Sequence, residues 1–135
     1  MYWGFMSQIL MYIKDKKKET QILKLCERMG VSVRLFMAKD VNKTIGELTG
    51  MSHPLLSREN SLQSSKMSIP FLYQQPDIII FHGLSDQQLD QFLDEYRKDK
   101  IEPTPLKAVV TMHNLQWSVY ELTQELLKEA KYMKR

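Results

Sequence analysis

Apolar positions recur along the first third of the chain with two different spacings, which predict strands and helices in alternation. A short apolar run at residues 9–13 ends at a cluster of charges and predicts a buried strand. Residues 19–29 place apolar side chains at helical spacing, and Gly30 follows where a left-handed helix cap belongs. Residues 31–37 alternate apolar with polar positions and predict a second strand. A short helix is then expected over residues 44–50.

The last third of the chain repeats this order of elements. A continuous apolar run at residues 78–81 suits a strand that is covered on both faces. Ser85 and Gln88 stand at the two positions of a capping box, which predicts the start of a helix. Residues 106–112 predict a fourth strand. Ser118, with a glutamate three residues later, then begins a fourth predicted helix.

Two patterned regions, residues 8–50 and 77–133, therefore each show the order βαβα. Between them, residues 51–76 are rich in serine and show no sustained period, so they form an excursion between the two units. We expect a single α/β domain over residues 1–135, in which the units form one small, mostly parallel four-stranded sheet flanked by helices. The units also align without gaps at an offset of 74 residues, which favours an internal duplication.

Composition narrows the possible classes of protein. Apolar residues make up 43% and charged residues 26%, so 135 residues can build a packed core. The single cysteine, Cys26, excludes an intrachain disulfide and favours a reducing compartment, and its place in an apolar helical stripe predicts core packing. No stretch reaches the roughly 20 apolar residues that cross a bilayer, and no secretory signal pattern is present. We therefore expect a cytoplasmic protein without membrane contact.

The formal net charge of +3 is unevenly distributed along the chain. Residues 1–50 carry a net charge of +4 and residues 76–135 a net charge of −2. Regions of opposite sign attract each other within a chain or between chains, although solvated charges contribute little per pair. Three consecutive lysines at residues 16–18 open the first predicted helix, and we expect them to be solvated rather than bound to phosphates. Nucleic-acid binding is therefore only the third hypothesis.

One segment carries a recognisable pattern. Residues 81–85 read FHGLS, residues 106–111 read LKAVVT, and Asn114 and Trp117 follow. This pattern resembles the bacterial family catalogued as domain of unknown function 3783, over roughly residues 77–133. The resemblance implies no activity, cofactor or partner, so it supports the predicted fold and leaves the function open.

Polar side chains follow each predicted strand. In a parallel sheet they would share one rim, where α/β proteins bind ligands. The rim would hold Asp15, Lys16, Lys39, Asp40, His82, Ser85, His113, Asn114 and Trp117. Within it, a hypothetical site for a polar or anionic ligand consists of His82, Ser85, His113, Asn114 and Trp117. The helix that begins at Ser85 would supply amide donors, although a capping role alone also explains Ser85.

No glycine-rich phosphate loop, nucleophile elbow or pair of catalytic carboxylates is found, so we assign no catalytic residue. The three histidines, His53, His82 and His113, do not have ligand spacing, and we expect no metal and no cofactor. The leading hypothesis is a non-catalytic interaction module that docks a protein partner or a second copy of itself. The alternative is a sensor of a small polar or anionic ligand at the predicted rim.

Overall fold

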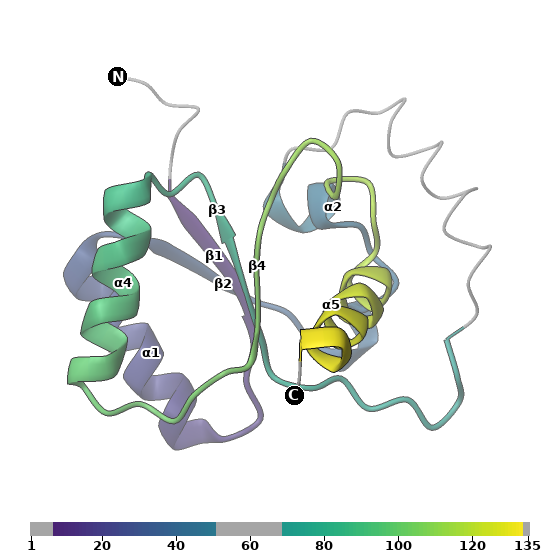
Figure 1. Ribbon diagram of the computed structural model, residues 1–135, viewed down its shortest axis with the longest axis horizontal. Coiled ribbons are helices and arrows are strands. Elements are labelled where there is room, and N and C mark those ends of the chain that lie inside the picture. The colour runs from purple at the N-terminus through teal and green to yellow at the C-terminus, as the bar shows by residue number, and fades with distance from the viewer. Residues whose placement is uncertain (1–6, 51–68, 134–135) are drawn as a thin grey trace.

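The computed structural model describes residues 7–50 and 69–133, which fold into three layers with a sheet between two pairs of helices (Figure 1). α1 and α4 cover one face of the sheet, and α2 and α5 cover the other. The elements follow in the order β1 (Gln8–Tyr12), α1 (Lys16–Met29), β2 (Ser32–Leu35), a short 3-10 helix (Ala38–Asp40), α2 (Ile45–Thr49), β3 (Ile78–His82), α4 (Asp86–Lys98), β4 (Leu106–Val109) and α5 (Val119–Met133). The predicted α/β class and the four-stranded sheet are confirmed.

The sheet is mixed, so the expectation of a mostly parallel sheet is wrong. Its strand order is β2-β1-β3-β4. β1 and β2 are parallel, β3 and β4 are parallel, and the central pair β1 and β3 is antiparallel, with Leu10 opposite Ile80. A helical crossover forces each outer pair to be parallel. The excursion at residues 51–76 is long enough to return β3 in either direction, and no residue pattern within a strand specifies which.

Two cores lie on opposite faces of the sheet, because side chains of a strand alternate between its faces. Ile9, Met11, Ile79 and Phe81 join the core beneath α1 and α4. Leu10, Ile78 and Ile80 join the core beneath α2 and α5. All seven side chains are at most 3% exposed. The prediction that the apolar run at residues 78–81 is covered on both faces is thereby confirmed.

The predicted helix caps are also confirmed. The Ser85 hydroxyl accepts the Gln88 N–H at 3.1 Å, and the Gln88 side chain accepts the Ser85 N–H at 2.9 Å. Ser118 makes the same reciprocal pair with its glutamate, at 3.0 and 2.9 Å. Gly30 ends α1 with a φ of 73°, a left-handed conformation that glycine adopts without a steric penalty.

The N-termini of α2 and α5 are joined by backbone hydrogen bonds between residues far apart in the chain. The four bonds run from Ile45 N to Trp117 O at 2.9 Å, from Val119 N to Lys43 O at 3.1 Å, from Gly46 N to Leu115 O at 2.9 Å, and from Tyr120 N to Val41 O at 2.8 Å. The bonds form two reciprocal pairs. Adding 74 to the number of the donor in one bond gives the donor of its counterpart, and the acceptors are related by the same offset in the other direction. Each helix thus satisfies its first amides with carbonyls of the loop before the other helix.

Lys18 contradicts the expectation of three solvated lysines. Its side chain is buried, and its Nζ donates to Asp77 Oδ2 and to the Pro103 carbonyl, both at 3.0 Å. The sequence contained the signal for this burial. Lys18 precedes the core residue Ile22 by four positions, which places both on the inner face of α1. Only its neighbours Lys16 and Lys17 are exposed.

Candidate functional site

The mixed sheet divides the predicted rim. β1 and β2 run opposite to β3 and β4, so the carboxyl ends of the two pairs lie at opposite ends of the strands. One group of rim residues follows β1 and β2 and consists of Asp15, Lys16, Lys39 and Asp40. The second group follows β3 and β4 at the opposite end and consists of His82, Ser85, His113, Asn114 and Trp117. The expectation of one shared rim is wrong, because the residues divide into two groups, and the five residues of the hypothetical ligand site all belong to the second group.

Within this second group, several polar atoms serve the local fold. Asn114 accepts the Thr111 N–H at 2.9 Å and donates to the Val109 carbonyl at 3.1 Å. The rings of His113 and Trp117 meet edge to face at 5.3 Å. No hydrogen bond among the described residues joins His82 to the others. Ligand binding by this group stays a hypothesis.

His82 differs from the other members in having a buried ring nitrogen, Nδ1, without a hydrogen-bond partner among the described residues. Burial lowers the pKa of the imidazole, since the charged form loses solvation. The side chain therefore favours the neutral state.

The turns that follow the two outer strands, β2 and β4, are similar, but they differ in whether a side chain bonds the last outward carbonyl of the strand. After β2, the Phe36 N–H donates to the Met11 carbonyl and so points towards β1. Because the two ends of a peptide group point in opposite directions, the Leu35 carbonyl faces outward. After β4, the Val110 N–H donates to the Phe81 carbonyl, so the Val109 carbonyl faces outward in the same way. On β4, Asn114 covers that carbonyl with its amide. On β2, Asp40 holds the same position in the turn and accepts the Met37 N–H at 2.9 Å.

The Asp40 carboxylate has no N–H to donate. Its pKa is lowered by the Met37 N–H first and by Lys43 second, so it is ionised at neutral pH. No hydrogen bond to Leu35 O occurs in the described part of the chain. No residue within 7–50 and 69–133 therefore covers the edge of β2 at the place where Asn114 covers the edge of β4.

Apolar and cationic side chains flank this uncovered edge. Leu35 is 43% exposed and Met37 is 59% exposed. Arg34 and Lys39 are exposed as well. We call this surface, residues 32–39, the β2 edge.

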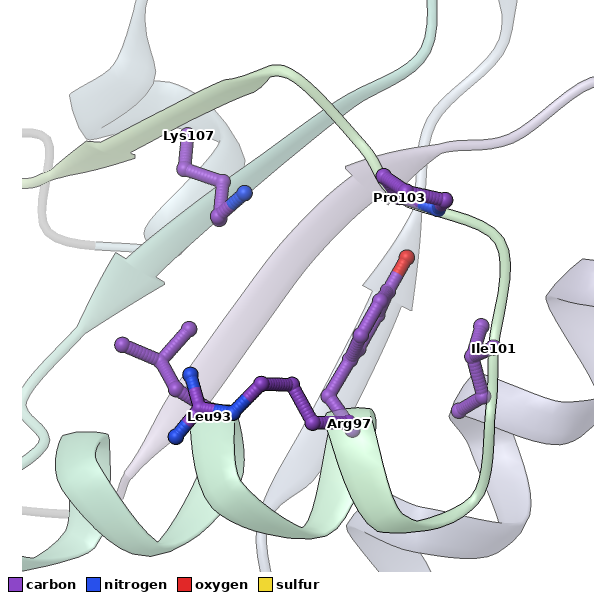
Figure 2. Close-up of a pocket in the computed structure, with 6 residues that line it drawn as sticks. Leu93, Arg97, Ile101, Pro103 and Lys107 are labelled. Atoms are coloured by element: carbon purple, nitrogen blue, oxygen red, sulfur yellow. The ribbon is translucent and has the colours of Figure 1, made fainter.

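A pocket of about 300 Å³ opens between α4 and β4, the edge strand on the opposite side of the sheet from β2. Figure 2 shows Leu93 and Arg97 rising from the helix, Lys107 pointing from the strand, and Ile101 and Pro103 on the connecting loop. The lining residues are Leu93, Tyr96, Arg97, Ile101, Pro103 and Lys107. We call it the α4–β4 pocket.

The polar atoms of the α4–β4 pocket are mostly cationic. Lys107 Nζ donates to the Thr104 carbonyl at 2.6 Å. Desolvation first, and the charge of Lys18 second, lower the pKa of Lys107. Arg97 is 73% exposed, and its partner among the described residues is Asp94 at 3.3 Å. Both cations thus retain donors for a further group.

The wall of the pocket is held by hydrogen bonds. The Tyr96 hydroxyl bonds the Glu102 carbonyl and lies 3.0 Å from Thr104 Oγ1. Burial raises the pKa of Tyr96. Lys18 bonds the Pro103 carbonyl from α1. The loop that forms the wall is therefore fixed from both helices on this face.

Sequence reasoning missed this pocket. The prolines at positions 103 and 105 marked a loop, but the path of a loop over a neighbouring helix is decided by tertiary packing. The one available signal was the lysine in an otherwise apolar strand, at position 107 of the LKAV segment.

Other chemistry is absent from the residues described. No group of three His, Cys, Asp or Glu side chains lies close enough to hold a metal ion within residues 7–50 and 69–133. His53 lies outside them. No described helix is long and apolar enough to span a membrane. Cys26 is buried in the core, as predicted, and burial raises the pKa of its thiol to about 12.

The described elements define a three-layer α/β/α protein with a mixed sheet and a pocket on one face. Residues 77–133 match the model of a family described as a domain of unknown function, DUF3783, which confirms the resemblance over that segment. The segment contains β3, α4, β4 and α5, and with them all residues of the α4–β4 pocket. No curated protein and no solved structure matches the chain.

Proposed function

We propose that this protein is a non-catalytic interaction module that docks an extended segment of a protein partner along the β2 edge. The observation that carries the proposal is an edge that none of the described residues covers, flanked by exposed Leu35 and Met37. Unpaired strand edges are templates for another strand, and proteins with no use for an open edge usually cover it. The turn after β4 supplies such a cover with Asn114, and the turn after β2 does not.

Strand addition explains how the β2 edge would recognise its partner. Main-chain hydrogen bonds to the outward groups of Val33 and Leu35 would provide affinity, and side chains would provide selectivity. Arg34 faces the opposite side of the sheet from Leu35, since neighbours alternate. The favoured partner segment therefore alternates apolar residues beside Leu35 with acidic residues beside Arg34.

A second copy of this chain fits the edge less well. Pairing two β2 strands about a two-fold axis brings the Arg34 side chains of both chains onto the same face, where like charges repel. Exposed Lys39 adds to the positive charge of each edge. We therefore favour an acidic partner over self-association.

A labelled ten-residue peptide that alternates valine and glutamate provides a direct test. We expect its addition to the full chain to shift the backbone amide resonances of residues 32–37 and to leave those of residues 106–110 in place. A peptide with lysine instead of glutamate should bind at least tenfold more weakly. Equal binding of both peptides, shifts centred on β4, or no binding at millimolar concentration would overturn the proposal.

Matched variants separate edge pairing from other contacts. Leu35→Pro removes an outward N–H and should abolish binding, whereas Val109→Pro at the corresponding position of β4 should not. Asp40→Asn introduces an amide that can cover Leu35 O, and we expect about fivefold weaker binding, on the scale of one hydrogen bond. Binding that persists in both Leu35→Pro and Asp40→Asn contradicts the model of strand addition. Sedimentation that shows a dimer held by β2 would identify self-docking instead.

We also propose that the two halves derive from duplication of a βαβα unit and that the protein works in the cytoplasm. The reciprocal bonds between residues 74 apart support duplication, and the lone buried thiol supports a reducing compartment. Superposition of residues 8–50 on residues 77–133 in an experimental structure tests the duplication. Crossovers of different path would contradict it.

A further inference from the structure

The α4–β4 pocket combines an apolar interior with a cationic rim. Leu93, Ile101, Pro103 and the ring of Tyr96 supply the apolar walls. Lys107 and Arg97 stand beside these walls with donors to spare, and Lys18 adds a third positive charge nearby. Small-molecule sites commonly have this composition, with apolar walls and a few polar groups that fix the orientation of the ligand.

We propose that the α4–β4 pocket binds a small organic carboxylate with a compact apolar body. The site is separate from the β2 edge, and the proposal does not depend on docking there. The carboxylate would lie between Lys107 and Arg97, and the body would replace water against Leu93 and Ile101.

The charges around the pocket favour a negatively charged ligand. Three acidic residues lie near the pocket. Asp77 is paired with Lys18 at 3.0 Å and Asp94 with Arg97 at 3.3 Å, whereas Glu102 is exposed to solvent, which screens its charge. Lys107 has only a carbonyl as its partner among the described residues, so its charge is not neutralised. An anion would relieve the repulsion between Lys107 and Lys18, whereas a cation would increase it.

The shape of the donors favours a carboxylate. The planar guanidinium of Arg97 matches the two oxygens of a carboxylate in a bidentate pair. Arg97 projects from α4 and Lys107 from β4, and both line the same pocket (Figure 2). A volume of about 300 Å³ stands at the lower end of ordinary ligand pockets, so the pocket suits a ligand with a small apolar body.

Three probes test the proposal on the full chain: 3-phenylpropionate, its neutral amide, and acetate. We expect 3-phenylpropionate to shift amide resonances of residues 93–107 at millimolar concentration. The amide lacks the charge and acetate lacks the apolar body, so each should bind at least tenfold more weakly. Equal binding of the amide, or shifts that map elsewhere, would overturn the proposal.

Two variants locate the binding groups. Lys107→Val should weaken 3-phenylpropionate binding at least tenfold, and it introduces the residue that β2 carries at the corresponding place, Val33. Lys98→Gln removes a charge on α4 outside the pocket lining and should leave binding within twofold. Arg97→Gln covers the case that Lys107→Val perturbs the strand. Full binding by both Lys107→Val and Arg97→Gln would refute a site built on these cations.

Discussion

The two halves of the sheet present the same elements in the same order, yet they differ in where they are open. In the first half, residues 8–50, only residues 30 and 31 separate α1 from β2, and Val33 packs against the core beneath α1. In the second half, residues 77–133, seven residues separate α4 from β4, and Lys107 stands at the place of Val33. The first half has a filled interior beside an uncovered edge, and the second half has a pocket beside a covered edge.

Small changes produce this difference. Val33 lies opposite Ile9 in its parallel pair, and Lys107 lies opposite Ile79 in the other, so both point towards the helices of the same face. The longer loop before β4 supplies one wall of the pocket, and Lys107 turns its ammonium to the Thr104 carbonyl, whereas Val33 packs against the core. After β4, Asn114 stands where Asp40 stands after β2, and its amide covers the edge of β4. Loop length and two side chains thus separate two surfaces on a common scaffold.

The largest expected effect concerns the partly buried ion pair between the two halves, Lys18 with Asp77. Lys18→Met leaves Asp77 without its ammonium partner in a partly buried place, and we expect a loss of about 3 kcal/mol in the free energy of unfolding. Urea denaturation measures this loss. Lys17→Met, one residue earlier on the exposed side of α1, should change stability by less than about 0.5 kcal/mol. Similar values for both variants would mean that the contact does not join the halves.

A smaller effect is expected where the two crossover helices end. Gly30, directly after α1, has a φ of 73°, and Lys100, two residues after the end of α4, lies in the same left-handed region with a φ of 55°. Lys100→Gly should stabilise the protein by up to about 1 kcal/mol, because glycine adopts this conformation without steric cost.

Gly30→Ala should have the opposite effect and cost about 1 kcal/mol, since the left-handed φ alone opposes the new Cβ, which would meet nothing within 4 Å. Thermal unfolding of both variants gives the comparison. If Lys100→Gly destabilised the protein, the two helix ends would differ in more than backbone strain.

The smallest effect concerns pH. Burial lowers the pKa of His82 in the folded chain, so below about pH 6.5 the unfolded chain binds a proton that the folded chain resists. Stability should therefore be full above neutral pH and fall as the pH drops below this value.

β1 and β2 contain no histidine, so the second half alone supplies this dependence. His82→Gln should flatten the stability profile between pH 7 and pH 5, as followed by urea denaturation. A profile unchanged by the substitution would assign the dependence to other groups.

Features encoded locally could be predicted from the sequence. The caps at Ser85 and Ser118 were predictable because their partners lie three residues away, and Gly30 because a helix end favours glycine. The apolar run at residues 78–81 revealed its two-sided burial directly. Strand ends were less certain: the second and fourth strands stop at Leu35 and Val109, before the turns that follow, whereas apolar residues continue beyond them.

Features that depend on distant residues could not be predicted. The direction of β3 relative to β1 depends on how residues 51–76 return the chain, so the single rim was wrong. The α4–β4 pocket requires the path of residues 99–105 over α4. The uncovered edge of β2 was within reach, since Asp40 and Asn114 align at the offset of 74 residues. The difference between the Asp40 carboxylate and the Asn114 amide affects the strand edge only because both turns lie beside an outward carbonyl, and the sequence alone does not show this position.

The reciprocal bonds between the starts of α2 and α5 also bear on how the chain matures during synthesis. Residues 41–46 leave the ribosome long before residues 115–120, which carry the complementary groups. The first half lacks its central sheet neighbour until β3 emerges, and it lacks the carbonyls that satisfy α2 until residues 115–117 follow. Such distant pairings form slowly because a long loop must close first. Stable folding should therefore wait until residues 115–120 have been synthesised, and a nascent chain arrested before Leu115 should remain sensitive to protease.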